Sequence, residues 1–358
     1  MRRPGCARSG IGRRFSRVTE TLAGWTTLRV GGPVRRWVTA TDRAELLAAV
    51  IECDERGDDI LLIGRGSNLV VADGGFDGTV IEIATRGIAS VDEGCGGAWV
   101  EVEAGESWDD LVKWSIAEQW RGMEALSGIP GSVGATPIQN VGAYGRDVAS
   151  IIARVTVFDR RSAKMRVLAA GDCGFGYRHS IFKSEPDRFV VLAVAFQMRR
   201  GDFSEPVAYA ELADALNIAV GECTESERVR EAVLGLRRRK GMVLDPDDHD
   251  TWSVGSFFVN PVVPADRVPE GAPAWPQPEG LVKTSAAWLV ENAGFPRGFA
   301  LHGSAAAVST KHSLALTNRG GATAAQIMEL ARTIHAEVES RFGIDLVIEP
   351  RLIGFDSI

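Results

Sequence analysis

The sequence predicts an α+β fold with more than one domain, and three observations lead to this prediction. The chain has 358 residues, which is long enough for two or three domains. Segments with the alternating apolar pattern of strands, such as 99–105, occur beside amphipathic helical patterns such as 225–239. Hydrophobic residues make up 45% of the chain and charged residues 24%, as is typical of a globular protein.

The expected elements follow a basic N-terminal segment. Residues 1–17 are rich in arginine and lack the apolar segment of a signal peptide, so we expect a flexible tail over 1–20. Asp42 is suited to cap a helix that runs to about Arg56, and Ser107 is suited to start a helix that runs to Gln119. Further helices are expected at 225–239 and 323–341, and strands at 34–40, 59–63, 69–71, 78–83, 99–105, 154–158, 164–168, 189–198 and 346–353.

Two segments are expected at the surface. Helix 225–239 ends in the charge run Arg237-Arg238-Arg239-Lys240, which is typical of a solvated face. Residues 261–278 are irregular and rich in proline, which indicates a surface connection.

A glycine-rich loop covers residues 129–145, with the sequence IPGSVGATPIQNVGAYG. Neither a helical nor a strand period describes it, and small or amide-bearing side chains separate its glycines. Glycine lets backbone N–H groups come close to a ligand, and such groups suit the oxygens of a diphosphate. A plain surface loop is the alternative interpretation.

A second glycine loop lies upstream, where Gly64-Arg65-Gly66-Ser67-Asn68 separates two apolar strands. A Rossmann dinucleotide site needs G-x-G-x-x-G at the start of a helix. Position 69 is Leu and strand-like residues follow, so the segment is better described as a strand–turn–strand phosphate loop. Together the two loops indicate a dinucleotide held by backbone amides outside a Rossmann fold.

These loops, together with Gly255-Ser256-Phe257-Phe258 and Ile348-Glu349-Pro350, resemble the UDP-N-acetylenolpyruvoylglucosamine reductases over about residues 25–354. The resemblance implies a flavoenzyme of peptidoglycan precursor synthesis, of the longer-chain type with a substrate-clamping tyrosine. It implies a two-subdomain FAD-binding architecture like that of vanillyl-alcohol oxidase (PCMH-like, not Rossmann), plus an α+β substrate-binding domain. The expected boundaries are 21–86 and 343–358 for FAD-binding subdomain 1, 87–237 for subdomain 2, and 238–342 for the substrate-binding domain.

The resemblance also implies three catalytic residues. Hydride addition to an enolpyruvyl double bond needs a cation near the substrate carboxylate and a proton donor at the other carbon. Arg178 takes the place of the family's active-site arginine, Glu349 would be a second electrostatic partner, and Ser256 would give the proton. From the residues alone, Arg178 could be a strand-end arginine, Glu349 a partner of Arg351, and Ser256 a serine at the start of a strand.

The remaining site residues are also implied by the resemblance. The cofactor would be held by Gly64, Arg65, Gly66, Ser67, Asn68, Gly131, Ser132, Gly134, Ala135, Gly142, Ala143 and Tyr144. The substrate, UDP-N-acetylenolpyruvoylglucosamine, would be held by Tyr209, Lys240, Asn260 and His312, with His312 replacing a glutamine of some relatives. All five histidines follow both glycine loops, so we expect FAD to be bound non-covalently. NADPH is expected as the co-substrate.

Composition excludes several partners and sites. The net charge of −7 argues against nucleic acid, and no apolar run approaches the ~18 residues of a membrane span. Five widely spaced cysteines without a C-x-x-C pair fit reduced thiols in the cytoplasm and exclude a zinc site. We expect no metal, no membrane insertion and a monomer. Three alternatives stay open: an FAD-dependent oxidase of the same fold acting on another alcohol or sugar, a non-catalytic flavin or UDP-sugar sensor, and a Rossmann dehydrogenase, whose glycine spacing is missing.

Overall fold

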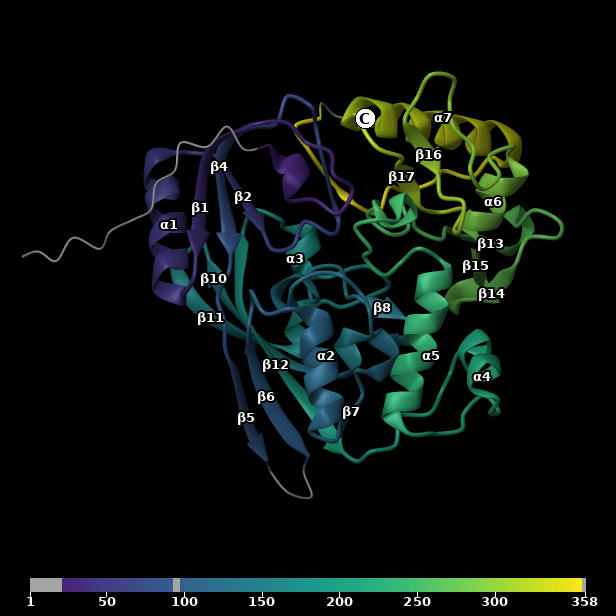
Figure 1. Ribbon diagram of the computed structural model, residues 1–358. Coiled ribbons are helices and arrows are strands. Elements are labelled where there is room, and N and C mark those ends of the chain that lie inside the picture. Colours follow the sequence, from purple (N-terminus) through teal and green to yellow (C-terminus); the bar gives the residue numbers. More distant parts are fainter. Residues whose placement is uncertain (1–20, 93–96, 356–358) are drawn as a thin grey trace, which may run out of the picture.

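The computed structural model describes residues 21–92 and 97–355. This part of the chain contains a parallel sheet, a larger antiparallel sheet and a C-terminal region that includes helices α6 and α7 (Figure 1). No helix of the described residues is long and apolar enough to cross a membrane.

The parallel sheet has the strand order β1-β4-β2. Asp42 accepts a hydrogen bond from the Glu45 amide at 2.8 Å, which caps helix α1, and Gly57 ends this helix with a φ of 67°. The apolar side of α1 packs in a cluster that includes Ile81 of the sheet and Leu192 of the antiparallel sheet. The elements of this region are β1 (Val34–Ala40), α1 (Arg43–Arg56), β2 (Ile60–Ile63), β3 (Leu69–Val71) and β4 (Phe76–Ile83).

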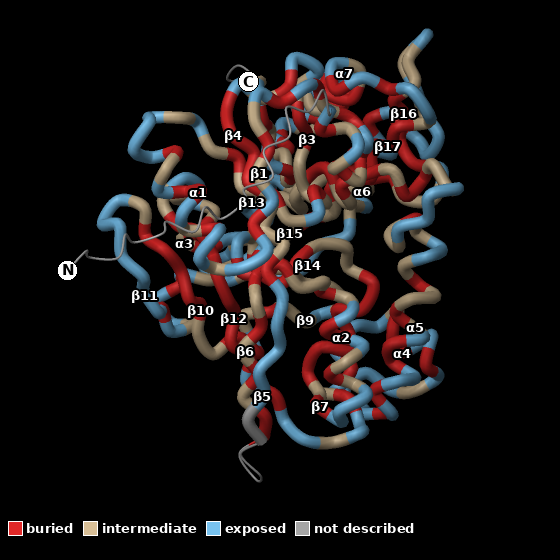
Figure 2. Tube along the Cα trace, turned by 60° about the vertical axis from the view of Figure 1, so that its left-hand side comes forward, coloured by how far each residue is buried: buried red, intermediate tan, exposed pale blue. Residues whose placement is uncertain are grey.

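The antiparallel sheet has the order β11-β10-β12-β6-β5, with β7 paired to the end of β12. Its central strand β12 is buried along most of its length, as the red tube in Figure 2 shows. Helix α2 covers the sheet and contributes Trp108 and Leu111 to its core. The elements are β5 (Ile88–Asp92), β6 (Ala98–Glu103), α2 (Trp108–Ala117), β7 (Trp120–Arg121), β8 (Gly142–Ala143), β9 (Arg146–Asp147), β10 (Ile152–Asp159), β11 (Lys164–Ala169), α3 (Ile181–Ser184) and β12 (Phe189–Arg200).

Two helices follow the antiparallel sheet and pack against each other. Val229 and Val233 of α5 face Leu212 and Leu216 of α4 in a separate apolar cluster. Arg230 of α5 donates two hydrogen bonds, of 2.7 and 2.9 Å, to Asp109 of α2. The two helices are α4 (Ala210–Leu216) and α5 (Ser226–Arg239).

The C-terminal region contributes the largest apolar cluster, built around helices α6 and α7. Leu28 and Val70 from the N-terminal part of the chain belong to the same cluster, so the two ends of the chain share one core. The last strand, β18, pairs in parallel with β3. The elements are β13 (Val262–Pro264), β14 (Ala274–Pro276), β15 (Leu281–Thr284), α6 (Ala286–Asn292), β16 (Ala306–Val308), β17 (Leu316–Asn318), α7 (Ala324–Phe342) and β18 (Arg351–Ile353).

Most expected elements are confirmed, and three details are corrected. Helix α2 ends at Ala117 because Gln119 has a φ of 59°, which no helix accommodates. The last strand is shorter than 346–353 because Pro350 has no N–H for the sheet, so only residues after it pair with β3. The segment 261–278 is not wholly irregular, since β13 and β14 flank β15 in a small sheet.

Candidate active site

A cavity of about 500 Å³ lies where the two glycine loops meet the C-terminal region. Gly64 to Asn68 form one wall, and residues from Ile129 to Gly142 form another. Arg178, Ser256 and Glu349 all line it, so the structure brings together the three residues expected to be catalytic.

The turn between β2 and β3 needs its glycines for close approach. A Cβ at Gly66 would lie 2.0 Å from the carbonyl oxygen of Trp25, and the φ of Gly66 is 59°. A Cβ at Gly64 would lie 2.3 Å from the Ser132 hydroxyl of the other loop. A side chain at Gly66 would therefore clash with backbone, and one at Gly64 would require the Ser132 side chain or the turn to shift.

Side-chain hydrogen bonds join the two loops. The Ser67 hydroxyl donates to the Pro130 carbonyl at 3.0 Å, and the Asn68 amide donates to Gln139 at 2.8 Å. The backbone N–H groups of residues 65–68, 131 and 132 donate no hydrogen bond to any described residue. Buried or half-buried N–H groups are normally paired, so this row of free donors fits the diphosphate of a dinucleotide such as FAD.

Arg178 is held at the cavity by backbone carbonyls. Its guanidinium donates to the Gly142 carbonyl at 2.8 Å and to the Asn140 carbonyl at 3.4 Å. Its own backbone has a φ of 52°, and the Lys183 ammonium donates to its carbonyl at 3.1 Å. The arginine is therefore oriented by the glycine loop that forms the cavity wall.

Glu349 is the buried carboxylate of the site. Its Oε1 lies 3.2 Å from Nε of Arg178. The two groups form an ion pair, but the Nε–H of Arg178 does not point well enough at the oxygen to make a hydrogen bond. Burial raises the pKa of Glu349, and the positive charges of Arg178 and Lys183 offset only part of this rise. Arg351, the alternative partner considered from the sequence, pairs with Asp187 instead.

Ser256 reaches the cavity from a short extended segment that pairs with the segment of Glu349. The Glu349 amide donates to the Phe257 carbonyl at 2.9 Å, and Phe258 forms a bridge with Ile348. Phe257 and Phe258 are buried and anchor the segment. The Ser256 hydroxyl itself makes no hydrogen bond with the described residues, so it is free to contact a ligand.

Arg237 is a cavity residue that the sequence analysis missed. It belongs to the charge run 237–240, which was expected at a solvated face, yet its side chain lines the cavity. It donates to the Met242 carbonyl at 2.9 Å, and no described residue accepts from its Nε. Burial lowers the pKa of Arg237 to about 10. Only three-dimensional packing distinguishes this arginine from Arg238 and Arg239, which are exposed.

The expected cofactor residues Gly64 to Asn68, Gly131, Ser132, Gly134, Ala135 and Gly142 line the cavity, whereas Ala143 and Tyr144 do not. Tyr144 packs edge-to-face on Tyr209, with ring centroids 5.7 Å apart. Burial raises the pKa of Tyr144 to about 12.

The four expected substrate residues lie outside the cavity lining. Lys240 donates to Glu211 at 2.6 Å, and Asn260 accepts from the Ala286 amide at 3.0 Å. Two effects lower the pKa of His312 to about 4: burial is the larger, and the positive charge of Lys240 is the second. Tyr209, Lys240 and His312 lie around Glu211, which pairs with Lys240 and whose charge reaches the other two, so they form a group separate from the cavity lining.

The described residues contain no cluster of three or more histidine, cysteine or acidic side chains that could hold a metal ion. Among the described residues that line the cavity, Glu349 is the one carboxylate, and the cations are Arg65, Arg178, Lys183, Arg237 and Arg351. The site can therefore bind anionic groups and deliver a proton from a hydroxyl.

Two family descriptions match the chain. Residues 245–353 match the C-terminal domain of UDP-N-acetylenolpyruvoylglucosamine reductase, and residues 34–168 match an FAD binding domain. The first covers the segments of Ser256 and Glu349, and the second covers both glycine loops.

Individual relatives agree with these matches. A UDP-N-acetylenolpyruvoylglucosamine reductase from Cutibacterium acnes is 56% identical over 334 residues, which cover 93% of this chain and 89% of that protein. The protein of the same name from Streptomyces coelicolor is 50% identical over 347 residues, with 93% and 89% covered. A crystal structure of UDP-N-acetylenolpyruvylglucosamine reductase from Thermus caldophilus is 25% identical, covers 95% of this chain and 99% of its own, and superposes with a TM-score of 0.65.

Proposed function

The chain belongs to the UDP-N-acetylenolpyruvoylglucosamine reductase family, and from this premise we propose how its residues carry out the reaction. It is an FAD-dependent oxidoreductase that reduces UDP-N-acetylenolpyruvoylglucosamine to UDP-N-acetylmuramate with NADPH, in peptidoglycan precursor synthesis. The fold has the two-subdomain FAD-binding architecture and not that of a Rossmann dehydrogenase.

FAD would be held by the free backbone N–H groups of residues 65–68, 131 and 132, which would donate to its diphosphate. When bound, FAD takes up electrons from NADPH and supplies the hydride to the sugar. We propose non-covalent binding, because none of the five histidines and none of the cysteines Cys53, Cys173 and Cys223 lines the cavity.

Arg178 would bind the carboxylate of the enolpyruvyl group. Its guanidinium is permanently charged and is already oriented by the Asn140 and Gly142 carbonyls, so it opposes the negative charge that grows on the substrate during hydride transfer. Glu349, with its raised pKa, can remain protonated and donate a hydrogen bond to the same charge.

Ser256 would complete the addition. Hydride arrives at one carbon of the double bond, and the electron pair of that bond spreads over the other carbon and the carboxylate. The Ser256 hydroxyl then gives its proton to the second carbon, since such a carbanion is basic enough to deprotonate a hydroxyl. The observation that carries this proposal is that Ser256, Arg178 and Glu349 line the same cavity.

Tyr209, Lys240, Asn260 and His312 would bind the UDP end of the substrate. Tyr209 is exposed and Lys240 is half-buried, so both side chains are accessible to a ligand. A lysine ammonium suits a phosphate as a point charge. The low pKa of His312 keeps its ring neutral near neutral pH, so it would act by hydrogen bonding.

We further propose that the enzyme acts in the cytoplasm as a monomer. Cys53, Cys173 and Cys223 are free thiols, which fits a reducing compartment. Its partners would be the small molecules NADPH and UDP-N-acetylenolpyruvoylglucosamine, with no nucleic acid, in agreement with the net charge of −7.

The Ser256→Ala variant tests the proton-donor role by stopped-flow spectroscopy of the two half-reactions. Flavin reduction by NADPH should keep its rate, because no proton from Ser256 is needed. Flavin reoxidation by the enolpyruvyl sugar should slow by about 10²–10⁴-fold, the usual range for loss of a general acid. Unchanged rates in both half-reactions would rule out the role of Ser256.

A further inference from the structure

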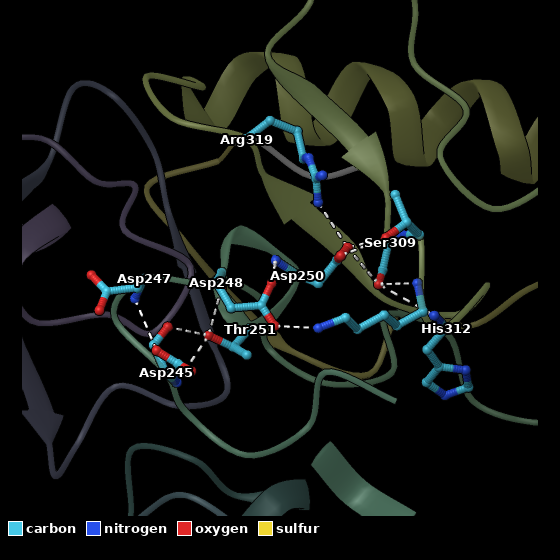
Figure 3. A network of polar contacts seen from close by, with 10 residues as sticks. Asp245, Asp247, Asp248, Asp250, Thr251, Ser309, His312 and Arg319 are labelled. Atoms are coloured by element: carbon cyan, nitrogen blue, oxygen red, sulfur yellow. Dashed lines mark hydrogen bonds and ion pairs between the residues drawn. The ribbon is translucent and has the colours of Figure 1, made fainter. Parts of the chain in front are cut away.

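Beside the cavity, a polar network joins the segment that precedes Ser256 to the segment that carries His312 (Figure 3). Its centre is Asp250, in the turn His249–Thr251. The Asp250 side chain is 5% exposed and does not line the cavity.

Asp250 accepts four hydrogen bonds from the C-terminal region. The donors are the Ser309 hydroxyl at 2.8 Å, the Thr310 amide at 2.8 Å, the Thr310 hydroxyl at 2.5 Å and the Arg319 guanidinium at 2.7 Å. Hydrogen bonds to a charged, buried acceptor are the strong and directional ones. The network therefore fixes the turn of Asp250 against the loop 309–312 and against the end of β17.

The Ser309 hydroxyl extends the network to His312. While it donates to Asp250, it accepts from the Lys311 amide at 3.0 Å and from the His312 amide at 3.2 Å. The Lys311 side chain is also fixed, because its ammonium pairs with Asp248. The backbone conformation that directs His312 is thus built on the Asp250 carboxylate.

The chain after Asp250 leads directly to the cavity. The Trp252 carbonyl accepts from the Asn318 amide at 3.0 Å, and the Ser253 carbonyl accepts from the Thr27 hydroxyl at 2.6 Å. Thr251, Ser253, Val254, Gly255 and Ser256 all line the cavity. A shift of the Asp250 turn would therefore move Ser256.

We propose that Asp250 is a positioning residue that sets Ser256 and His312 relative to each other for reduction of the sugar. It acts through the two segments that it joins and touches neither the flavin nor the substrate. This inference depends on the proposed function of Ser256, and its specific claim is that the sugar half-reaction depends on Asp250 while flavin reduction does not.

The Asp250→Asn variant tests this claim. An asparagine amide places an N–H₂ group where one carboxylate oxygen now accepts, so two donors would face each other and the loop 309–312 would move. Flavin reduction by NADPH should be unchanged, while reoxidation by the enolpyruvyl sugar should slow by about 10²-fold, the size expected for a displacement of about 1 Å. The KM for the sugar should also rise. Asp247→Asn, at an exposed neighbouring residue, is the matched control and should leave both half-reactions unchanged.

A second variant keeps the test decisive if Asp250→Asn does not fold. Ser309→Ala leaves the carboxylate and Arg319 in place and removes only the hydroxyl that joins Asp250 to the Lys311 and His312 amides. It should raise the KM for the sugar and slow the sugar half-reaction in a protein that still binds and reduces FAD.

Three results would overturn the inference: normal sugar reduction in a folded Asp250→Asn variant, normal sugar reduction in Ser309→Ala, or equal losses in both half-reactions. Failure of the wild-type flavin to be reoxidised by the sugar would instead contradict the proposed function.

Discussion

The Glu349 carboxylate is buried beside Arg178, and two opposite effects act on its pKa. Burial disfavours the charged form and raises the pKa, while Arg178 and Lys183 favour the charged form and lower it. Burial is the larger effect, so the folded protein binds this proton more tightly than the unfolded chain does. A raised pKa contributes stability below the unfolded value near 4.5, and that contribution is lost as the pH rises through the folded value.

Glu349→Gln should therefore stabilise the protein relative to wild type at pH 8 but not at pH 4.5. The glutamine cannot ionise, so it avoids the cost that wild type meets above the unfolded pKa of Glu349, where folding must either bury the charge or take up a proton. Thermal melting at the two pH values measures the effect, and Glu270→Gln at an exposed position controls for the substitution itself. An equal difference in Tm at both pH values would contradict the raised pKa.

At the scale of elements, the two glycine loops meet in a close contact in addition to their two side-chain hydrogen bonds. Gly64 of the β2–β3 turn lies against Ser132 of the glycine-rich loop, and the residues with free N–H groups in both loops line the same cavity. The contact leaves no space for a methyl group, because a Cβ would lie 2.3 Å from the Ser132 hydroxyl and 3.1 Å from its Cβ.

Gly64→Ala should consequently weaken FAD binding by at least about tenfold, because a displaced turn would misalign its N–H groups with the diphosphate. This size is within the range of about 1–3 kcal/mol that overpacking of a close contact costs. Quenching of flavin fluorescence gives the Kd. Gly74→Ala is the control, because no atom lies within 4 Å of a Cβ there. Equal FAD affinity of the two variants would show that the Gly64 contact does not shape the cofactor site.

The helices and strands around this site could be predicted from the sequence better than the set of side chains that line it. Alternating apolar residues and caps such as Asp42 act locally, and β1 and α1 appear where such signals place them. The inward position of Arg237 could not be predicted, because four consecutive cations look alike in sequence and only packing against the Met242 segment buries one of them. The Asp250 network could not be predicted from the sequence either, since its partners Ser309 and Arg319 lie 59 and 69 residues away.

At the scale of the whole molecule, the N-terminal and C-terminal parts are interlocked. Strand β18 pairs with β3, and Asn318 donates to the Leu28 and Arg29 carbonyls. Asp73 caps helix α7 from 251 residues away, accepting from the Ala324 amide at 2.8 Å and the Ala325 amide at 2.9 Å. We propose that the domain boundaries lie at 86, 237 and 342, with the last segment returning to the first subdomain.

Asp73→Ala should lower the free energy of unfolding by about 1 kcal/mol, because it leaves two amides of the α7 N-terminus without their acceptor. Denaturant unfolding followed by circular dichroism measures this. Asp77→Ala is the matched control, because its carboxylate is almost fully exposed and its ion pair with Arg35 spans 3.7 Å. A loss no larger than that of the control would contradict a role for Asp73 in joining the two parts of the chain.

The most direct test of the account is the visible spectrum of the purified protein during one anaerobic titration. We predict a flavin absorbance band that is bleached by NADPH and restored by UDP-N-acetylenolpyruvoylglucosamine. A band that only oxygen restores would contradict the reductase assignment and indicate an oxidase. A colourless protein that takes up no added FAD would contradict the assignment of both glycine loops.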